Sequence, residues 1–133
     1  MSREESTAIG AAGEAAVTAE LAAAGFHVYV PAFGSPEADL LAVKAGKVIS
    51  VQVKTLTGDT DSLSFDLRTS TKKTYTGTVD WMALHSLHHR ITAFLKPEEV
   101  GSRLALRYDG QSAPNRHSAA DYSLERVIKE LSA

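Results

Sequence analysis

The chain has 133 residues, of which 44% are hydrophobic and 23% are charged, with a formal net charge of −2. This length suits one compact domain over residues 1–133, and the hydrophobic share is high enough to form a core, which excludes a disordered chain. The absence of cysteine excludes a disulfide framework, and the lack of a bilayer-spanning apolar run or a secretory signal predicts a cytoplasmic protein.

The predicted elements begin with a helix, continue with a run of five or six strands and end with a second helix. Residues 6–24 are alanine-rich with apolar side chains at helical spacing, and Gly25 is placed to cap this helix. The strand candidates are 26–30, 40–43, 48–54, 63–67, 79–86 and 89–96, with 102–108 as a further one. The tail 122–131 has one apolar helical face, and Ser123 is its expected N-cap. This order predicts an α+β fold, a central mixed β-sheet flanked by an N-terminal and a C-terminal helix.

Three polar side chains are expected together at one end of the hairpin formed by 40–43 and 48–54. Gln52 and Lys54 share one face of their strand, because alternate residues of a strand point to the same side. Asp39 directly precedes the partner strand, so its carboxylate should lie beside them. Oxygen ligands suit Mg²⁺, and a nearby lysine can orient a water molecule or stabilise charge on a phosphate. The alternative is a charged hairpin end with Lys54 in solvent, because this spacing alone is a weak pattern.

The first helix contains two glycines, Gly10 and Gly13, on one side. A glycine inside a helix costs about 1 kcal/mol relative to alanine, so we expect a close approach of this helix to the sheet in compensation. Glu14 follows Gly13 and would be held near that contact. The alternative for Glu14 is a solvent-facing helix acid, which is the more common position of a lone glutamate.

Charge is unevenly distributed along the chain. Residues 1–40 contain one basic and six acidic residues, whereas residues 41–116 contain eleven basic and seven acidic ones. Segment 68–78 is polar and suits phosphate contacts or stacking on a base through Arg68, Lys72, Lys73 and Tyr75. A solvated loop is the alternative that composition alone leaves open.

Six segments carry a recognisable pattern by their order and spacing. They are GAAGEAAV (10–17), AGFHVYVP (24–31), ADLLAV (38–43), VISVQVKT (48–55), TGTVDWMALHSLHHRITAFLKPEEV (76–100) and NRHSAADYSLERV (115–127). Together they resemble the PD-(D/E)XK nuclease superfamily, in particular its small intron-associated homing endonucleases and its Holliday junction resolvase-like group.

The resemblance implies a restriction-endonuclease-like fold and Mg²⁺-dependent hydrolysis of DNA phosphodiester bonds, with Mn²⁺ as a substitute metal. It implies a catalytic site in which Lys54 positions the attacking water and the metal is held by Glu14, Asp39, Gln52 and the Val53 carbonyl. It also favours DNA contact for the four residues of segment 68–78. A homodimer or higher homo-oligomer is expected, because enzymes that cut both strands often act as symmetric assemblies.

Two positions depart from the family pattern. Ala38 stands where the family has a proline before the aspartate, and Gln52 is neutral at the second ligand position. A neutral ligand should weaken cation binding. The alternative to an active endonuclease is therefore a weak or inactive nuclease-fold module that binds DNA or a protein partner. Because Asp39 and Lys54 are both present, we favour the active enzyme.

Overall fold

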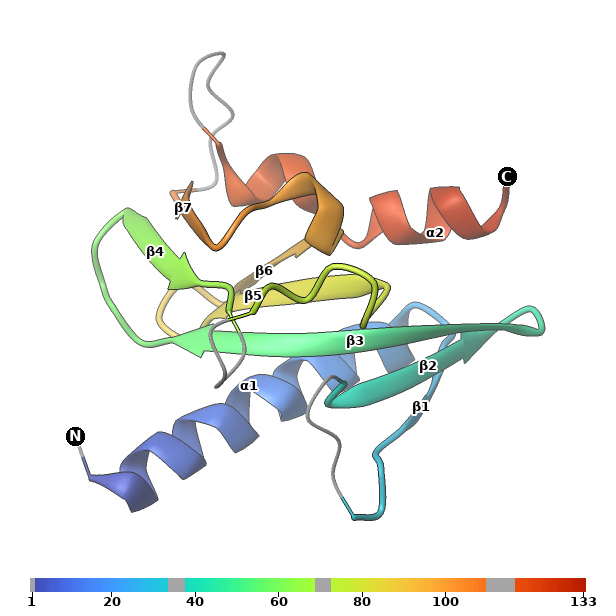
Figure 1. Cartoon of the computed structure of the whole chain (residues 1–133), viewed down its shortest axis with the longest axis horizontal. Coiled ribbons are helices and arrows are strands. Elements are labelled where there is room, and N and C mark those ends of the chain that lie inside the picture. The colour runs from blue at the N-terminus through green and yellow to red at the C-terminus, as the bar shows by residue number, and fades with distance from the viewer. Residues whose placement is uncertain (1, 34–37, 69–72, 110–116) are drawn as a thin grey trace.

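Helices at the two ends of the chain enclose a run of strands in the computed structural model, which describes residues 2–33, 38–68, 73–109 and 117–133 (Figure 1). The elements are α1 (Arg3–Ala23), β1 (His27–Tyr29), β2 (Leu40–Lys44), β3 (Lys47–Leu56), β4 (Ser62–Asp66), β5 (Trp81–Ser86), β6 (Ile91–Leu95), η1 (Pro97–Glu99), β7 (Arg103–Arg107), η2 (Ala119–Tyr122) and α2 (Glu125–Leu131). None of the helices among these residues is both long enough and apolar enough to span a membrane.

Five of the strands form one mixed sheet in the order β1-β2-β3-β5-β6. Neighbouring strands are antiparallel except for β3 and β5, which run parallel. This sheet and its terminal helices confirm the predicted α+β fold. The strands β4 and β7 instead pair with each other as a separate antiparallel sheet, so the predicted run of strands is divided between two sheets.

Local signals place the ends of α1. The Ser2 hydroxyl accepts a hydrogen bond from the Glu5 N–H (3.1 Å), so the helix starts three residues before the predicted start. At the other end Gly25 adopts a φ of +94°, and the N–H groups of Gly25 and Phe26 donate to carbonyls of the last turn. The predicted glycine cap is therefore confirmed, because a positive φ is easily adopted only by glycine.

The hairpin of β2 and β3 has a two-residue turn at Ala45 and Gly46, both with positive φ. A tight turn of this kind matches the twist of the strands and determines their register. Leu40, the first residue of β2, pairs with Val51 in the middle of β3. The second half of β3, residues 52–56, therefore extends past β2 and pairs only with β5.

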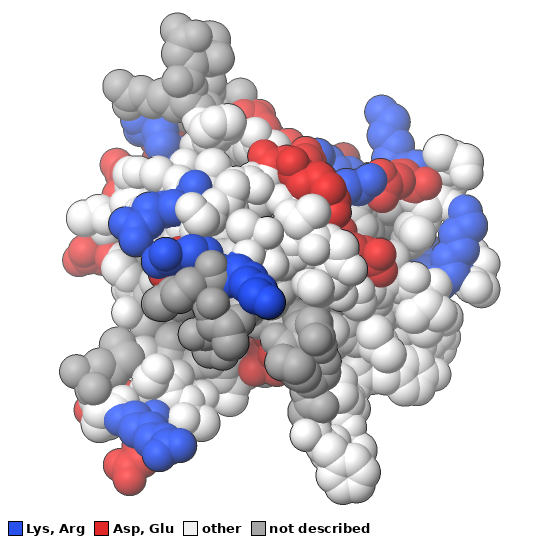
Figure 2. Space-filling model, in the orientation of Figure 1, with Lys and Arg blue, Asp and Glu red and all other residues white. Residues whose placement is uncertain are grey.

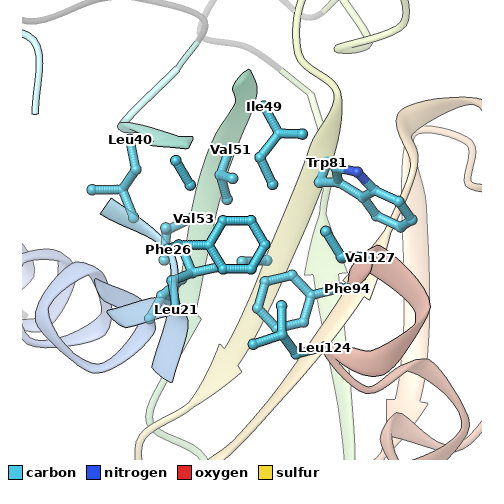
Figure 3. Packing of buried hydrophobic residues seen from close by; sticks show 13 residues of the cluster. Leu21, Phe26, Leu40, Ile49, Val51, Val53, Trp81, Phe94, Leu124 and Val127 are labelled. Atoms are coloured by element: carbon cyan, nitrogen blue, oxygen red, sulfur yellow. The ribbon is translucent and has the colours of Figure 1, made fainter. Parts of the chain in front are cut away.

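The two faces of the mixed sheet are covered by different layers. On the helical face, side chains from α1, α2 and the sheet form one buried cluster that includes Leu21, Phe26, Val51, Val53, Trp81, Phe94, Leu124 and Val127 (Figure 3). On the other face, side chains of β4 and β7 pack over β5 and β6 in a second cluster that includes Phe65, Met82, Leu84, Leu95, Leu106 and Tyr108. Strand β5 lies between the two cores, because Trp81 and Ala83 belong to the first cluster and Met82 and Leu84 to the second, and β3 is its parallel neighbour.

The two glycines of α1 have different surroundings. A Cβ atom at Gly13 would lie 1.8 Å from the Thr55 Oγ1 of β3, so the predicted close approach of helix and sheet is confirmed there. At Gly10 a Cβ would meet nothing within 4 Å. The prediction that both glycines serve this contact is therefore wrong for Gly10.

The C-terminal helix begins later than its apolar pattern predicts. Residues 119–122 form the short helix η2, and α2 follows only from Glu125, with Leu124 at its N-cap position and no side-chain capping bond. Ser123 lies at the C-cap of η2, so its predicted role as the N-cap of the tail helix is wrong. Burial of Leu124 and Val127 in the first core compensates for the missing cap.

Because Gly13 is in close contact with Thr55, adding a single methyl group at residue 13 should destabilise the fold. Gly13→Ala should lower the free energy of unfolding by about 1–3 kcal/mol, although alanine favours a helix, because the added Cβ overlaps Thr55. Urea denaturation measures the change. In a double-mutant cycle, Thr55→Ala should recover part of the loss, and independent, additive effects would contradict the contact.

Candidate active site

Asp39 lies just before β2, and its carboxylate accepts a hydrogen bond from a backbone N–H of β3 that has no partner in β2. Its N–H donates to the Val51 carbonyl, and its Oδ2 accepts from the Val53 N–H, both at 2.9 Å. Because β2 starts at Leu40, Val53 has no strand residue opposite it on that side. The carboxylate satisfies this backbone donor, which would otherwise lose a hydrogen bond on burial.

Gln52 lies on the same side of the hairpin as Asp39. Extending the register by one residue from the Leu40–Val51 pair places Asp39 opposite Gln52, and opposite side chains share a face. The Gln52 side chain is buried, and its Oε1 has no hydrogen-bond partner among the described residues. An unpaired buried oxygen costs about 1–3 kcal/mol. We therefore expect this atom to bind a ligand that is not part of the chain.

Val53 contributes a backbone group at the same place. In a β-strand the N–H and C=O of one residue point to the same neighbour. Since the Val53 N–H points to Asp39, its carbonyl oxygen is also directed to the open edge of β3 next to Asp39. The expected adjacency of Asp39, Gln52 and Val53 thus follows directly from the hairpin register.

Glu14 reaches this edge from α1. Burial raises the pKa of the Glu14 carboxyl, and the negative charge of Asp39 raises it further. For Asp39, burial raises the pKa, while the Val53 hydrogen bond and the positive charge of Lys54 partly offset that increase. Two half-buried carboxylates that repel each other are typical of a site that binds a cation or a proton.

Lys54 is partly buried and lies beside a cavity of about 370 Å³ whose wall also includes Glu14. Its Nζ is 5.2 Å from the ring centroid of Tyr75, which is within the range of a cation–π contact. The alternative in which Lys54 leaves the strand for solvent is therefore not what the structure shows. The ammonium lies over the Tyr75 ring, and its positive charge acts to lower the pKa of Asp39.

The oxygen atoms at this edge fit a divalent cation of the Mg²⁺ type. They comprise two carboxylates, from Glu14 and Asp39, one unpaired amide oxygen and one backbone carbonyl, and such hard ligands suit Mg²⁺. Within the described ranges there is no group of three or more His, Cys, Asp or Glu residues that could hold a metal. Metal binding would therefore depend on Gln52 and Val53 as well as on the two acids.

Asp80 occupies a similar position on the other edge of β3, and the sequence analysis did not single it out. It directly precedes β5, and its Oδ2 accepts hydrogen bonds from the Ser50 N–H (2.8 Å) and hydroxyl (3.2 Å). An aspartate that precedes a strand can thus act as a backbone cap alone. Asp80 is exposed and lines a cavity that also includes Lys96, Glu98 and Glu130, where Lys96 pairs with Glu130. Because it caps a backbone N–H as Asp39 does, it is a matched control for the capping role of Asp39.

Three of the four residues expected to contact DNA are among the described residues, and their surroundings differ. The Arg68 guanidinium group donates two hydrogen bonds to the Asp66 carboxylate, both of 2.9 Å, and Lys73 is exposed. Lys72 lies outside the described residues. The stacking role expected for Tyr75 requires an exposed ring, but Tyr75 is only 4% exposed and belongs to the second core. Its contact with Lys54 could not be predicted, because it joins residues 21 positions apart on different elements.

Several basic side chains gather in one area of the face shown in Figure 2. These Lys and Arg side chains lie over the region of β4 and β7, whereas side chains of both signs occur toward α2. A basic area of this kind attracts polyanions.

Comparison with known proteins gives one family and two similar folds. A family model described as PD-(D/E)XK endonuclease matches residues 5–91, which is 87 of the 133 residues. The bacterial homing endonuclease I-Ssp6803I is similar in structure, with a TM-score of 0.73 and 16% identity over 93% of this chain and 90% of that one. The Holliday junction resolvase Hjc of Archaeoglobus fulgidus has a TM-score of 0.51 and 17% identity over 74% and 83%. No curated protein sequence gave a significant match.

The raised pKa of Asp39 predicts how stability depends on pH. The folded state binds the Asp39 proton more tightly than the unfolded state, whose pKa is about 4, so stability falls as pH rises through the folded pKa. Asp39→Asn removes the charge and keeps an acceptor for Val53. In EDTA it should be more stable than the wild type at pH 8, with the difference vanishing near pH 4.

Urea titrations over this pH range measure the effect. Asp39→Ala, which leaves the Val53 N–H unpaired, should be destabilised at every pH. A lower stability of Asp39→Asn at pH 8 would show that the carboxylate is a stabilising cap and contradict the prediction.

Proposed function

The chain belongs to the PD-(D/E)XK endonuclease family, and on this basis we propose that it is a metal-dependent DNA endonuclease that hydrolyses phosphodiester bonds. Membership supports a nuclease-type function, and similarity of fold to a homing endonuclease and a junction resolvase agrees with it. The observation that carries the proposal is the unpaired, buried Gln52 Oε1 opposite Asp39, whose carboxylate in turn raises the pKa of Glu14. A cation would satisfy the orphaned oxygen and remove the repulsion between Glu14 and Asp39.

We assign the metal to Asp39, Glu14, the Gln52 Oε1 and the Val53 carbonyl, with Mg²⁺ as the cofactor and Mn²⁺ as a substitute. A bound divalent cation supplies electrophilic stabilisation of the negative charge that builds up on a phosphate during hydrolysis. The chain itself supplies orientation. The Val53 N–H holds the Asp39 carboxylate in one direction, and burial limits the rotamers of Gln52.

Lys54 is assigned to the attacking water and the scissile phosphate. Its ammonium can donate hydrogen bonds to a water molecule and to phosphate oxygens, which orients the nucleophile and offsets developing charge. The Tyr75 ring and the Asp39 carboxylate restrict where the ammonium lies. Tyr75 is thus a positioning residue in this proposal, because it acts through Lys54 and not through contact with DNA.

DNA binding and assembly complete the proposal. Arg68 and Lys73 are exposed enough to contact phosphates. The Arg68–Asp66 ion pair is on the surface and adds little stability, so Arg68 can exchange it for a phosphate contact.

A homodimer or higher homo-oligomer would cut both strands. Exposed apolar side chains on β1 and β2 and after the end of β1 suit contact with a second copy of the chain. They include Tyr29, Val30 and Phe33.

A second candidate function is a nuclease-fold module that binds DNA or a protein partner without cutting efficiently. The neutral Gln52 favours it, because the site then has only two carboxylates within the described part of the chain. Metal binding separates the two functions. An active enzyme should bind Mn²⁺ through Asp39, whereas a binding module should bind its partner equally well without metal.

Paired aspartate variants test the site. Asp39→Asn and Lys54→Ala should lower the rate of plasmid cleavage by at least about 10²-fold, because each loses charge that acts on the reacting phosphate. Asp80→Asn, which changes the matched cap at the other edge of β3, should cleave at the wild-type rate. Plasmid, branched and single-stranded DNA are assayed with Mg²⁺ or Mn²⁺. An equal fall of the cleavage rate in Asp39→Asn and Asp80→Asn would indicate that both aspartates have a structural role.

Gln52→Glu tests the neutral ligand. A third carboxylate should tighten Mn²⁺ binding on the order of tenfold, because ligand charge tunes affinity, and it should destabilise the metal-free protein through repulsion of Asp39 and Glu14. Calorimetric titration with Mn²⁺ measures the affinity. Unchanged Mn²⁺ affinity in Gln52→Glu, or in Asp39→Asn, would contradict the metal assignment and favour the binding module.

Variants of Tyr75 test the positioning of Lys54. Tyr75→Phe keeps the ring and should cleave DNA at nearly the wild-type kcat, whereas Tyr75→Leu removes the cation–π contact and should reduce kcat about tenfold with little change in KM. Thermal denaturation serves as the control for folding. A rise in KM in both variants, with kcat unchanged, would instead indicate that the Tyr75 hydroxyl binds DNA.

A further inference from the structure

A cavity of about 370 Å³ lies between the N-terminal half of α1 and the second half of β3. The helix contributes Ser6, Ile9, Gly10 and Glu14 to its wall, and the strand side contributes residues 53–57. In Figure 1 the two elements diverge toward the N-terminus of α1 and the arrowhead of β3. Glu14 and Lys54, both assigned to the reaction, therefore lie in the wall of a space that is large enough for part of a substrate.

Gly10 has no structural reason to be glycine. Its φ is not positive, since the positive-φ glycines of the described chain are Gly25, Gly46 and Gly77. A Cβ at Gly10 would meet nothing within 4 Å, in contrast to Gly13. A glycine in the middle of a 21-residue helix nevertheless weakens that helix. The residue is therefore unfavourable for the free protein and is explained by something that enters the cavity.

The chemistry of the wall indicates what enters. Among the described residues, Lys54 is the one cationic residue in the wall, so they offer no partner to a second phosphate. Apart from Lys54 and the acidic Glu14, the side chains of the wall are hydroxyl-bearing (Ser6, Thr55, Thr57) or apolar (Ile9, Val53, Leu56). Acidic residues in the first turn of α1 also disfavour an additional anion nearby. A neutral group with both polar and apolar surface fits this lining, and the sugar and base of a nucleotide are such a group.

We propose that the cavity receives the nucleoside next to the scissile phosphate and that Gly10 leaves room for it. This inference rests on the proposed function, because it takes the phosphate to react between Glu14 and Lys54. A phosphodiester is bonded to one nucleoside on each side, so one of the two must lie next to that position. Gly10 is one helical turn before Glu14, on the same side of α1 and along the same wall.

Substitutions of increasing size at Gly10 test the proposal. Gly10→Ala and Gly10→Leu should fold and have a Tm equal to the wild type or roughly 2–4 °C higher, since both residues favour a helix. KM for DNA should rise about tenfold in Gly10→Ala and further in Gly10→Leu, with kcat much less affected. Ala15→Leu, at an exposed position of the same helix, is the control for size and should leave KM unchanged.

Each other outcome overturns the inference. An unchanged KM in Gly10→Leu shows that the cavity receives no part of the substrate. A large fall in Tm shows that Gly10 is required for folding. If the wild type does not cleave DNA, the proposed function fails by itself. Fluorescence anisotropy with a labelled duplex then decides the inference: weaker binding by Gly10→Leu than by Ala15→Leu supports it, and equal or undetectable binding overturns it.

Discussion

The hydrogen bond from the Val53 N–H to the Asp39 carboxylate connects every part of the candidate site. It exists because β2 is shorter than β3 and begins opposite Val51, so that β3 presents an unpaired backbone edge at residues 52–56. The aspartate that precedes β2 occupies this edge, next to Gln52 and to the Val53 carbonyl. Because β2 is shorter than β3, the Val53 N–H has no strand partner in β2 and donates to the Asp39 carboxylate instead. The Val53 carbonyl oxygen points to the same edge of β3. At the other edge of β3, the Asp80 carboxylate accepts a hydrogen bond from the Ser50 N–H in the same way.

The site is electrostatically unfavourable in the absence of a cation. Asp39 and Glu14 each have a raised pKa, and burial is the largest cause for both. The contact of Gly13 with Thr55 holds the helix close to the strand and keeps Glu14 near Asp39. An unpaired buried oxygen on Gln52 adds a further cost. Such costs are characteristic of functional sites, where stability is lower so that a ligand can bind tightly. The same reasoning applies to Gly10, which weakens α1 and leaves space beside Lys54.

The two faces of β3 point to different layers of the structure, which explains how one strand can contribute to both the core and the site. Val51 and Val53 pack against α1 and α2, while Gln52 and Lys54 face the layer that contains Tyr75 and the β4–β7 sheet. The apolar residues make the strand rigid, and rigidity keeps the polar residues in one arrangement. Tyr75 therefore contributes through packing under Lys54. The family comparison agrees with this division, because the matched region, residues 5–91, contains α1, the hairpin and the parallel pair of β3 and β5.

Features that depend on neighbouring residues could be predicted from the sequence. The glycine cap of α1, the turn at residues 45 and 46, the alternation along β3 and the adjacency of Asp39 and Gln52 all arise from local backbone preferences and the period of a strand. Features that depend on distant segments were decided by the tertiary structure. The pairing of β4 with β7, the burial of Tyr75 beneath Lys54 and the contrast between Gly13 and Gly10 each join elements whose relative position no local pattern specifies. The physical reason is that side-chain periodicity determines which face of an element is buried, whereas the partner on that face is determined by how all the elements pack together.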